Sequence, residues 1–299
     1  MTGSDSVLLA RFVLRRARTM GLNPLELARA AGVGPGALDG PPGSLPGQCY
    51  PRLWELFERR IDSAHVGLLA ARRYGMGELG MTDYLLSTAA TVGEGLCAAG
   101  EFGSRMSSAR RLQVAAETDR HLTLTTDTAS DADSRGAELA AQASFAFLTA
   151  RARFGAQAAI VPAAITFRQR APRHHAPFLE FFGTSTIEFG AAANSLTLRR
   201  ADLDRPQHSA NPGLAAVLRR GARATVLPEP PARAWADLVA AELDSARIGA
   251  PTPHPVTLDD MARHLNTSTR TLQRRLAAAG TGWHRELASA RMRAGDGSS

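Results

Sequence analysis

The sequence predicts two parts of different fold class. An α+β N-terminal part covers residues 1–225, with helices and a small antiparallel sheet, and an all-α C-terminal part covers residues 226–299. The length of 299 residues suits two domains. The alternation of apolar and polar residues that is typical of strands lies between residues 111 and 199. Pro228, Pro230 and Pro231 mark the boundary, because consecutive prolines stop a helix and stiffen a linker.

The N-terminal part opens with helices. Asn23 followed by Pro24 indicates a helix start, since asparagine caps a helix and proline suits its first position. Thr91 and Glu94 have the spacing of a capping box, which opens a later helix. From these signals and from helical periodicity we expect helices over residues 7–20, 23–32, 51–61, 65–74 and 91–106.

A hairpin marks the start of the sheet. Segments 111–117 and 121–127 alternate between apolar and polar residues, most clearly where Leu122 and Leu124 alternate with threonines, and Asp119 lies in the turn between them. A strongly apolar helix is expected over residues 138–154. The rest of this part is expected to form strands over residues 164–170, 186–190 and 195–199, and helices over 177–182 and from 211 to about 225.

The C-terminal part predicts a helix-turn-helix at residues 256–279. A helix over residues 232–248 and a proline-rich loop over 251–255 come first. A short helix then starts at Thr257, and Asn266 and Thr267 form the turn. Ser268 is placed to cap a second helix over residues 269–278, which Gly280 ends. Two short helices joined by such a turn have the geometry that enters a DNA major groove.

Basic residues concentrate around this motif. Residues 256–293 hold seven arginines and three acidic residues, so they carry four of the chain's seven net positive charges. We expect Arg270, Gln273 and Arg274 on the outer side of the second helix, because arginine can pair with guanine and glutamine with adenine. The predicted contacts to the DNA backbone, which position without specifying a sequence, are made by Arg263, Ser268, Thr269 and Arg275. The alternative is a solvated helical hairpin with a basic face.

The motif resembles the first helix-turn-helix of the AraC/XylS family of transcriptional regulators. The resemblance rests on Thr257-Leu258, Met261-Ala262, Leu265 and the run Ser268-x-Arg270-Thr271-Leu272-Gln273-Arg274-Arg275-Leu276. Residues 79–96, 181–183, 189–194 and 203–206 are similar to the subgroup with an arabinose-binding-like α+β regulatory domain. The resemblance implies a bacterial regulator with promoter or operator DNA and an unidentified small-molecule effector as partners. A cytoplasmic location is expected because the N-terminal segment is an amphipathic helix interrupted by arginines rather than a signal peptide. It also implies recognition positions at Arg270, Gln273 and Arg274.

One departure from the family pattern changes what we expect. The family has two helix-turn-helix units joined by a long helix; residues 283–292 match the start of that helix, and the second unit is missing from this sequence. A single unit makes fewer contacts with DNA than two. We therefore expect the chain to form a homodimer, or a heterodimer with paralogues, and so to recover affinity for DNA. The alternative is a DNA-silent paralogue that acts by pairing with full-length relatives.

The sequence offers little support for other kinds of site. Cys49 and Cys97 lie far apart and are expected to be inert, since a metal site needs a close pair. His174 and His175 are adjacent on an extended segment and point opposite ways, so they do not share a metal easily. We therefore expect no metal, no cofactor, no catalytic residues and hence no enzyme, and no membrane-spanning segment. The sequence identifies no effector-binding residue.

Overall fold

The computed structural model forms two compact units. It describes residues 3–41, 43–72, 74–103, 105–128, 134–224, 227–249 and 256–296. The sheet unit is Phe57–Val226, and the helix-turn-helix unit combines Met1–Leu56 with Leu227–Ser299. Residues 1–56 thus pack with the C-terminal helices, although they precede the sheet in the chain. The division of function between residues 1–225 and 226–299 stays a prediction.

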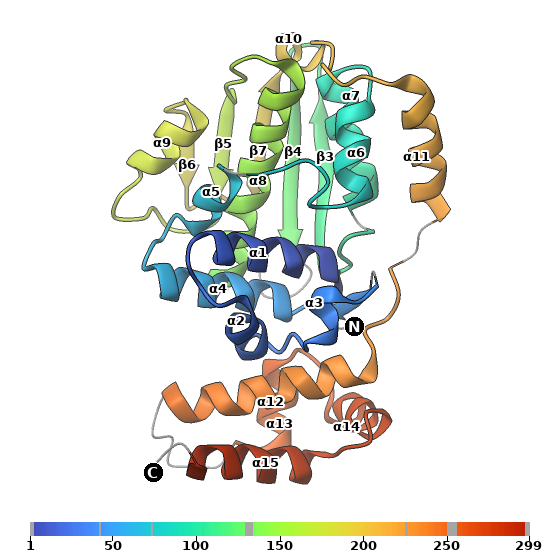
Figure 1. Ribbon diagram of the computed structural model, residues 1–299. Helices are drawn as coiled ribbons and strands as arrows, with labels where there is room; N and C mark the ends of the chain where they lie inside the picture. The colour runs from blue at the N-terminus through green and yellow to red at the C-terminus, as the bar shows by residue number, and fades with distance from the viewer. Residues whose placement is uncertain are drawn as a thin grey trace. The chain divides into compact units, whose positions relative to one another are not determined.

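The sheet unit contains a five-stranded sheet (Figure 1). Its strand order is β3 (Arg110–Glu117), β4 (His121–Thr128), β7 (Asn194–Arg199), β5 (Ala164–Phe167) and β6 (Ile187–Phe189). All pairs run antiparallel except β5 and β6, which run parallel. The predicted hairpin is confirmed as β3–β4, with a bulge between Val114 and Ala116.

One face of this sheet is apolar and buried beneath helices. Leu124, Leu196 and Phe167 are fully buried there, and Phe145 of helix α8 (Arg135–Ala156) packs 5.8 Å from the Phe167 ring. In Figure 1, α8 lies in front of the sheet and runs in roughly the same direction as the strands. The remaining helices of the unit are α5 (Val66–Ala71), α6 (Met81–Thr88), α7 (Val92–Gly103), α9 (Ala176–Phe182), α10 (Arg200–Leu203) and α11 (Pro212–Ala224).

The helix-turn-helix unit is mostly helical. Its first segment holds strands β1 (Ser4–Ser6) and β2 (Ser44–Pro46), paired antiparallel, with helices α1 (Val7–Thr19), α2 (Pro24–Ala30), α3 (Gly36–Asp39) and the start of α4 (Cys49–Ile61). Its second segment holds α12 (Ala232–Gly249), α13 (Leu258–His264), α14 (Thr269–Ala278) and α15 (Trp283–Asp296). The expected α+β fold with an all-α helix-turn-helix region is therefore confirmed. The sequence did not predict β1, β2, α3, α6 or α10, most of which are only three or four residues long.

Contacts between the two segments position α12 and α13. Arg52 of α4 forms a largely buried ion pair with Glu242 of α12 and donates to the Ala241 carbonyl at 2.9 Å. Gln48 Nε2 donates to the carbonyl of Leu265, at the end of α13, at 2.8 Å. Gly32 has a φ of +73°, and a side chain there would meet the Leu238 backbone of α12. These contacts join α12 and the end of α13 to the first segment of the unit.

No helix in the described ranges is both long and apolar enough to cross a membrane.

Candidate nucleic-acid interface

Helix α13 starts with a complete capping box. The Thr257 hydroxyl accepts from the Asp260 backbone N–H at 3.1 Å, and the Asp260 carboxylate accepts from the Thr257 N–H at 3.1 Å. These hydrogen bonds from Thr257 favour the charged carboxylate and lower the pKa of Asp260. Asp259 and Asp260 lie in the first turn, where the helix dipole favours negative charge. The start of the motif is therefore set by local sequence.

The turn and the second helix are also capped locally. Asn266 takes a left-handed φ of +49°, and the next N–H, of Thr267, bonds back to the Ala262 carbonyl at 2.9 Å. Ser268 caps α14, its hydroxyl accepting from the Thr271 N–H at 3.2 Å. Gly280, just past the end, has a φ of +74°, which glycine adopts without strain. The predicted helix-turn-helix at 256–279 is confirmed as a fold.

The inner side of the motif is a small apolar core. Leu272 and Leu276 of α14 are fully buried, as are Leu265 and, nearly so, Met261. Helix α12 packs against α14, and its Trp235 is 2% exposed. Burying this side fixes which side of α14 faces outward.

Arg270, Gln273, Arg274 and Ala277 form one stripe along the outer side of α14. They recur at the spacing of one helix face and all are exposed. In the described part of the chain, the side chains of Arg270, Gln273 and Arg274 form no hydrogen bond or ion pair. The stripe thus offers two guanidinium groups and one amide, each able to make paired hydrogen bonds to a base edge. Contact with bases stays a prediction.

Three of the four residues predicted to contact the DNA backbone already make contacts within the protein. Arg263 forms ion pairs with Asp259 and, at 3.2 Å, with Asp260. Ser268 is used as the cap of α14. The Arg275 guanidinium lies 3.7 Å from the centre of the Trp235 ring, and burial lowers its pKa. The fourth, Thr269, is half-buried in the first turn of α14.

Further basic residues lie on α15. Arg285 and Arg291 are exposed, and Arg285 donates to the Gly280 carbonyl at 3.0 Å. Arg293 is paired with Asp244 of α12 at 2.9 Å. The sequence places all three arginines in the basic cluster. It does not show that Arg293 is paired, because its partner Asp244 lies on a helix before the motif.

Histidines and cysteines do not assemble a second site in the described ranges. No group of three or more metal-binding side chains is placed to hold an ion there. The carbonyl of His174 accepts from the His65 ring at 2.6 Å, and the His175 ring contacts the Pro172 carbonyl at 3.1 Å. Both histidines thus take part in loop structure.

Comparison with known proteins assigns this chain to a protein family. The family model described as the arabinose-binding domain of AraC transcription regulators, N-terminal, matches residues 21–207. The solved structure of the transcriptional regulator CdpR from Pseudomonas aeruginosa is similar to the chain, with 18% identity and a TM-score of 0.49, over 95% of this chain and 84% of that one. A search of curated proteins gave no match.

The family match covers well over half of the chain and spans α2 to the end of the sheet. The chain therefore belongs to the AraC-type transcription regulators that carry this N-terminal domain.

Proposed function

We propose that this regulator binds DNA in a sequence-specific way, with α14 as the helix that enters the major groove. The observation that carries the proposal is the exposed stripe of Arg270, Gln273 and Arg274 on a helix whose opposite side is buried by Leu272 and Leu276. A helix held in this way presents its outer side chains to base edges without losing its own packing.

The stripe suits direct readout of a few base pairs. Arg270 and Arg274 are assigned to guanines and Gln273 to an adenine, each contact giving about 1–3 kcal/mol of discrimination. Thr269 and Ser268, at the start of α14, are assigned to a phosphate, because the positive end of a helix dipole favours one. Arg263 contacts a phosphate if it releases its two carboxylates. We reassign Arg275 from phosphate contact to positioning α14 against Trp235.

The remainder of the proposal concerns residues 1–225. We assign them to effector sensing or dimerisation, since the family match lies within them. The partners proposed are a small-molecule effector and a second copy of the chain or a paralogue. The expectation that the protein is not an enzyme agrees with the regulators that define the family.

The test begins with selection of DNA. The full-length protein is incubated with a pool of random duplexes, and bound duplexes are amplified and sequenced. Binding of one selected duplex and one scrambled duplex is then measured by fluorescence anisotropy at several salt concentrations. We expect the wild type to prefer the selected duplex, and the Arg270→Ala/Arg274→Ala variant to lose at least about tenfold of that preference.

A charge-matched control separates readout from general basicity. Arg111→Ala/Arg120→Ala removes two exposed arginines from the β3–β4 hairpin and should leave the preference unchanged. Equal preference in the wild type and the Arg270→Ala/Arg274→Ala variant contradicts the proposed readout. Failure of the pool to yield any enriched sequence contradicts DNA recognition itself and favours the DNA-silent alternative, in which the chain acts by pairing with full-length relatives.

A further inference from the structure

Arg151 of α8 is a buried cation without a close anionic partner. It is 7% exposed, and burial lowers its pKa, while the Asp83 carboxylate raises it. Its guanidinium carbon lies 5.4 Å from the centre of the Tyr74 ring and 5.2 Å from that of Phe154. Among the described residues Arg151 forms no ion pair, although arginine is rarely buried unpaired. Its hydrogen bonds therefore decide how well this charge is tolerated.

One edge of the Arg151 guanidinium lacks a strong acceptor. This edge carries Nε and Nη2, a pair that arginine uses to hold one planar acceptor group with two hydrogen bonds. Nη2 donates to the Met76 sulfur at 2.9 Å, and Nε has no hydrogen-bond partner in the described ranges. A thioether is a weak acceptor. Leaving a buried charged donor poorly satisfied costs free energy, which a better acceptor at this edge recovers.

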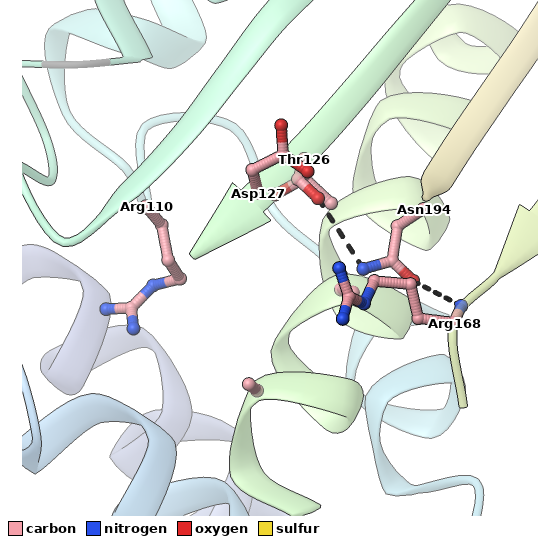
Figure 2. A pocket seen from close by; sticks show the side chains of 7 residues that line it. Arg110, Thr126, Asp127, Arg168 and Asn194 are labelled. Atoms are coloured by element: carbon pink, nitrogen blue, oxygen red, sulfur yellow. Dashed lines mark hydrogen bonds between the residues drawn. The ribbon is translucent and has the colours of Figure 1, made fainter. Parts of the chain in front are cut away.

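Helix α8 borders cavities of very different size. One, of about 160 Å³, lies beside its first turns, where the Asn194 side chain bridges the Arg168 N–H and the Thr126 carbonyl (Figure 2). Another, of about 10 Å³, is lined by Arg151 near the other end of the helix. Such a volume holds one water-sized group. The space beside Arg151 thus admits a single oxygen atom but no ligand of several atoms.

Met76 brings its sulfur to Arg151 from the turn of residues 75–80, which precedes α6. The Gly75 N–H donates to the Glu78 carboxylate at 3.2 Å, and this hydrogen bond helps to shape the turn. The Met76 side chain is 38% exposed. It is therefore open to small solutes on one side, while its sulfur contacts a buried guanidinium on the other.

We propose that Met76 is a modification site that hydrogen peroxide oxidises to methionine sulfoxide, with the new oxygen held by Arg151. The sulfur donates a lone pair to one peroxide oxygen, so an S–O bond forms as the O–O bond breaks. The proton of the transferred hydroxyl passes to the departing hydroxide, which leaves as water. The sulfur is thus oxidised by two electrons, and the peroxide is reduced by two. This inference goes beyond the proposed function and does not depend on DNA binding.

The sulfoxide suits this position better than the thioether does. Its oxygen is a strong acceptor that Nε and Nη2 of Arg151 can both reach, because the methionine side chain has three rotatable bonds. It carries no net charge, so it adds no repulsion toward the Asp83 carboxylate, which acts on the same guanidinium. Oxidation should therefore tie the turn to α8 and stabilise the protein, whereas a sulfoxide in a packed core normally disrupts it.

Limited oxidation of the full-length protein by hydrogen peroxide tests this proposal. Cleavage after Glu78 puts Met76 and Met81 on separate peptides, so mass spectrometry follows each one. Met81 is 39% exposed and is the matched control for access. We expect the treatment to convert both methionines and to raise the Tm, measured by circular dichroism, by about 2 °C or more. Met76→Leu should show no rise after the same treatment.

Arginine variants separate the hydrogen bond from oxidation itself. In Arg151→Leu, Met76 should still be oxidised, but the rise in Tm should be lost. Arg170→Leu removes an exposed arginine elsewhere and should keep the rise. The proposal is overturned if Met76 stays reduced while Met81 is oxidised, or if oxidation of Met76 leaves the Tm unchanged or lowers it. An equal rise in Arg151→Leu or in Met76→Leu also overturns it; if Arg151→Leu does not fold, the Met76→Leu comparison decides.

Discussion

Arg275 provides the sharpest test of the helix-turn-helix geometry. Its guanidinium stacks 3.7 Å from the centre of the Trp235 ring, and burial lowers its pKa. A cation–π contact contributes about 0.5–1 kcal/mol when exposed and about 2 kcal/mol or more when removed from water. Because Arg275 is only partly buried, we expect Arg275→Gln to lower the free energy of unfolding by about 1–2 kcal/mol.

The neighbouring residue supplies the control. Arg274→Gln removes the same charge from the exposed stripe of α14 and should change the free energy of unfolding by less than about 0.5 kcal/mol. Urea denaturation followed by tryptophan fluorescence measures both, since Trp54, Trp235 and Trp283 all belong to the helix-turn-helix unit.

DNA binding distinguishes the two roles of Arg275. A phosphate contact contributes about 0.9 to the slope of log K against log salt. We expect Arg275→Gln to leave this slope unchanged. An unchanged urea midpoint together with a smaller salt slope would refute the positioning role and restore the phosphate contact that the sequence suggested.

Three further predictions concern the base on which the helix-turn-helix rests. Arg52→Met removes the arginine partner of the largely buried Glu242 on α12, which keeps its contact with the His264 ring, so the free energy of unfolding should fall by about 1–3 kcal/mol; an unchanged urea midpoint would show that the ion pair contributes nothing. Gly32→Ala puts a Cβ 2.5 Å from the Leu238 Cα at a left-handed φ and should cost at least about 2 kcal/mol. Gly21→Ala has a similar φ but open surroundings, and equal losses in the two variants would contradict the close approach. Burial raises the pKa of the Cys49 thiol, so Cys49 should not react with Ellman's reagent at neutral pH until the protein unfolds; rapid reaction of Cys49 in the native protein, identified by mass spectrometry, would contradict its burial.

Local sequence signals predicted most of the helices and the hairpin. Asn23 and Ser268 cap the helices that they were expected to cap, and Gly280 has the left-handed conformation expected of it. These features were predictable because each depends on residues within one helical turn. The short strands β1 and β2 were not, since each is stabilised by pairing with a segment far along the chain.

The candidate DNA-binding residues show the same difference between local features and features that depend on distant segments. The outward stripe of Arg270, Gln273 and Arg274 follows from the 3.6-residue period of α14 and its two buried leucines. The stacking of Arg275 on Trp235 had no signal in the sequence, because Trp235 lies on a helix before the motif.

The sequence by itself therefore determined the fold class, the family and the position of the helix-turn-helix, because each depends on periodicity, capping residues and a local motif. Only the tertiary structure decided what individual charged side chains do. Arg275 lies on a ring from α12, and Arg52 pairs with Glu242 of the same helix. The physical reason is that the role of an arginine depends on what surrounds it, and those surroundings are brought together by segments that are distant in the chain.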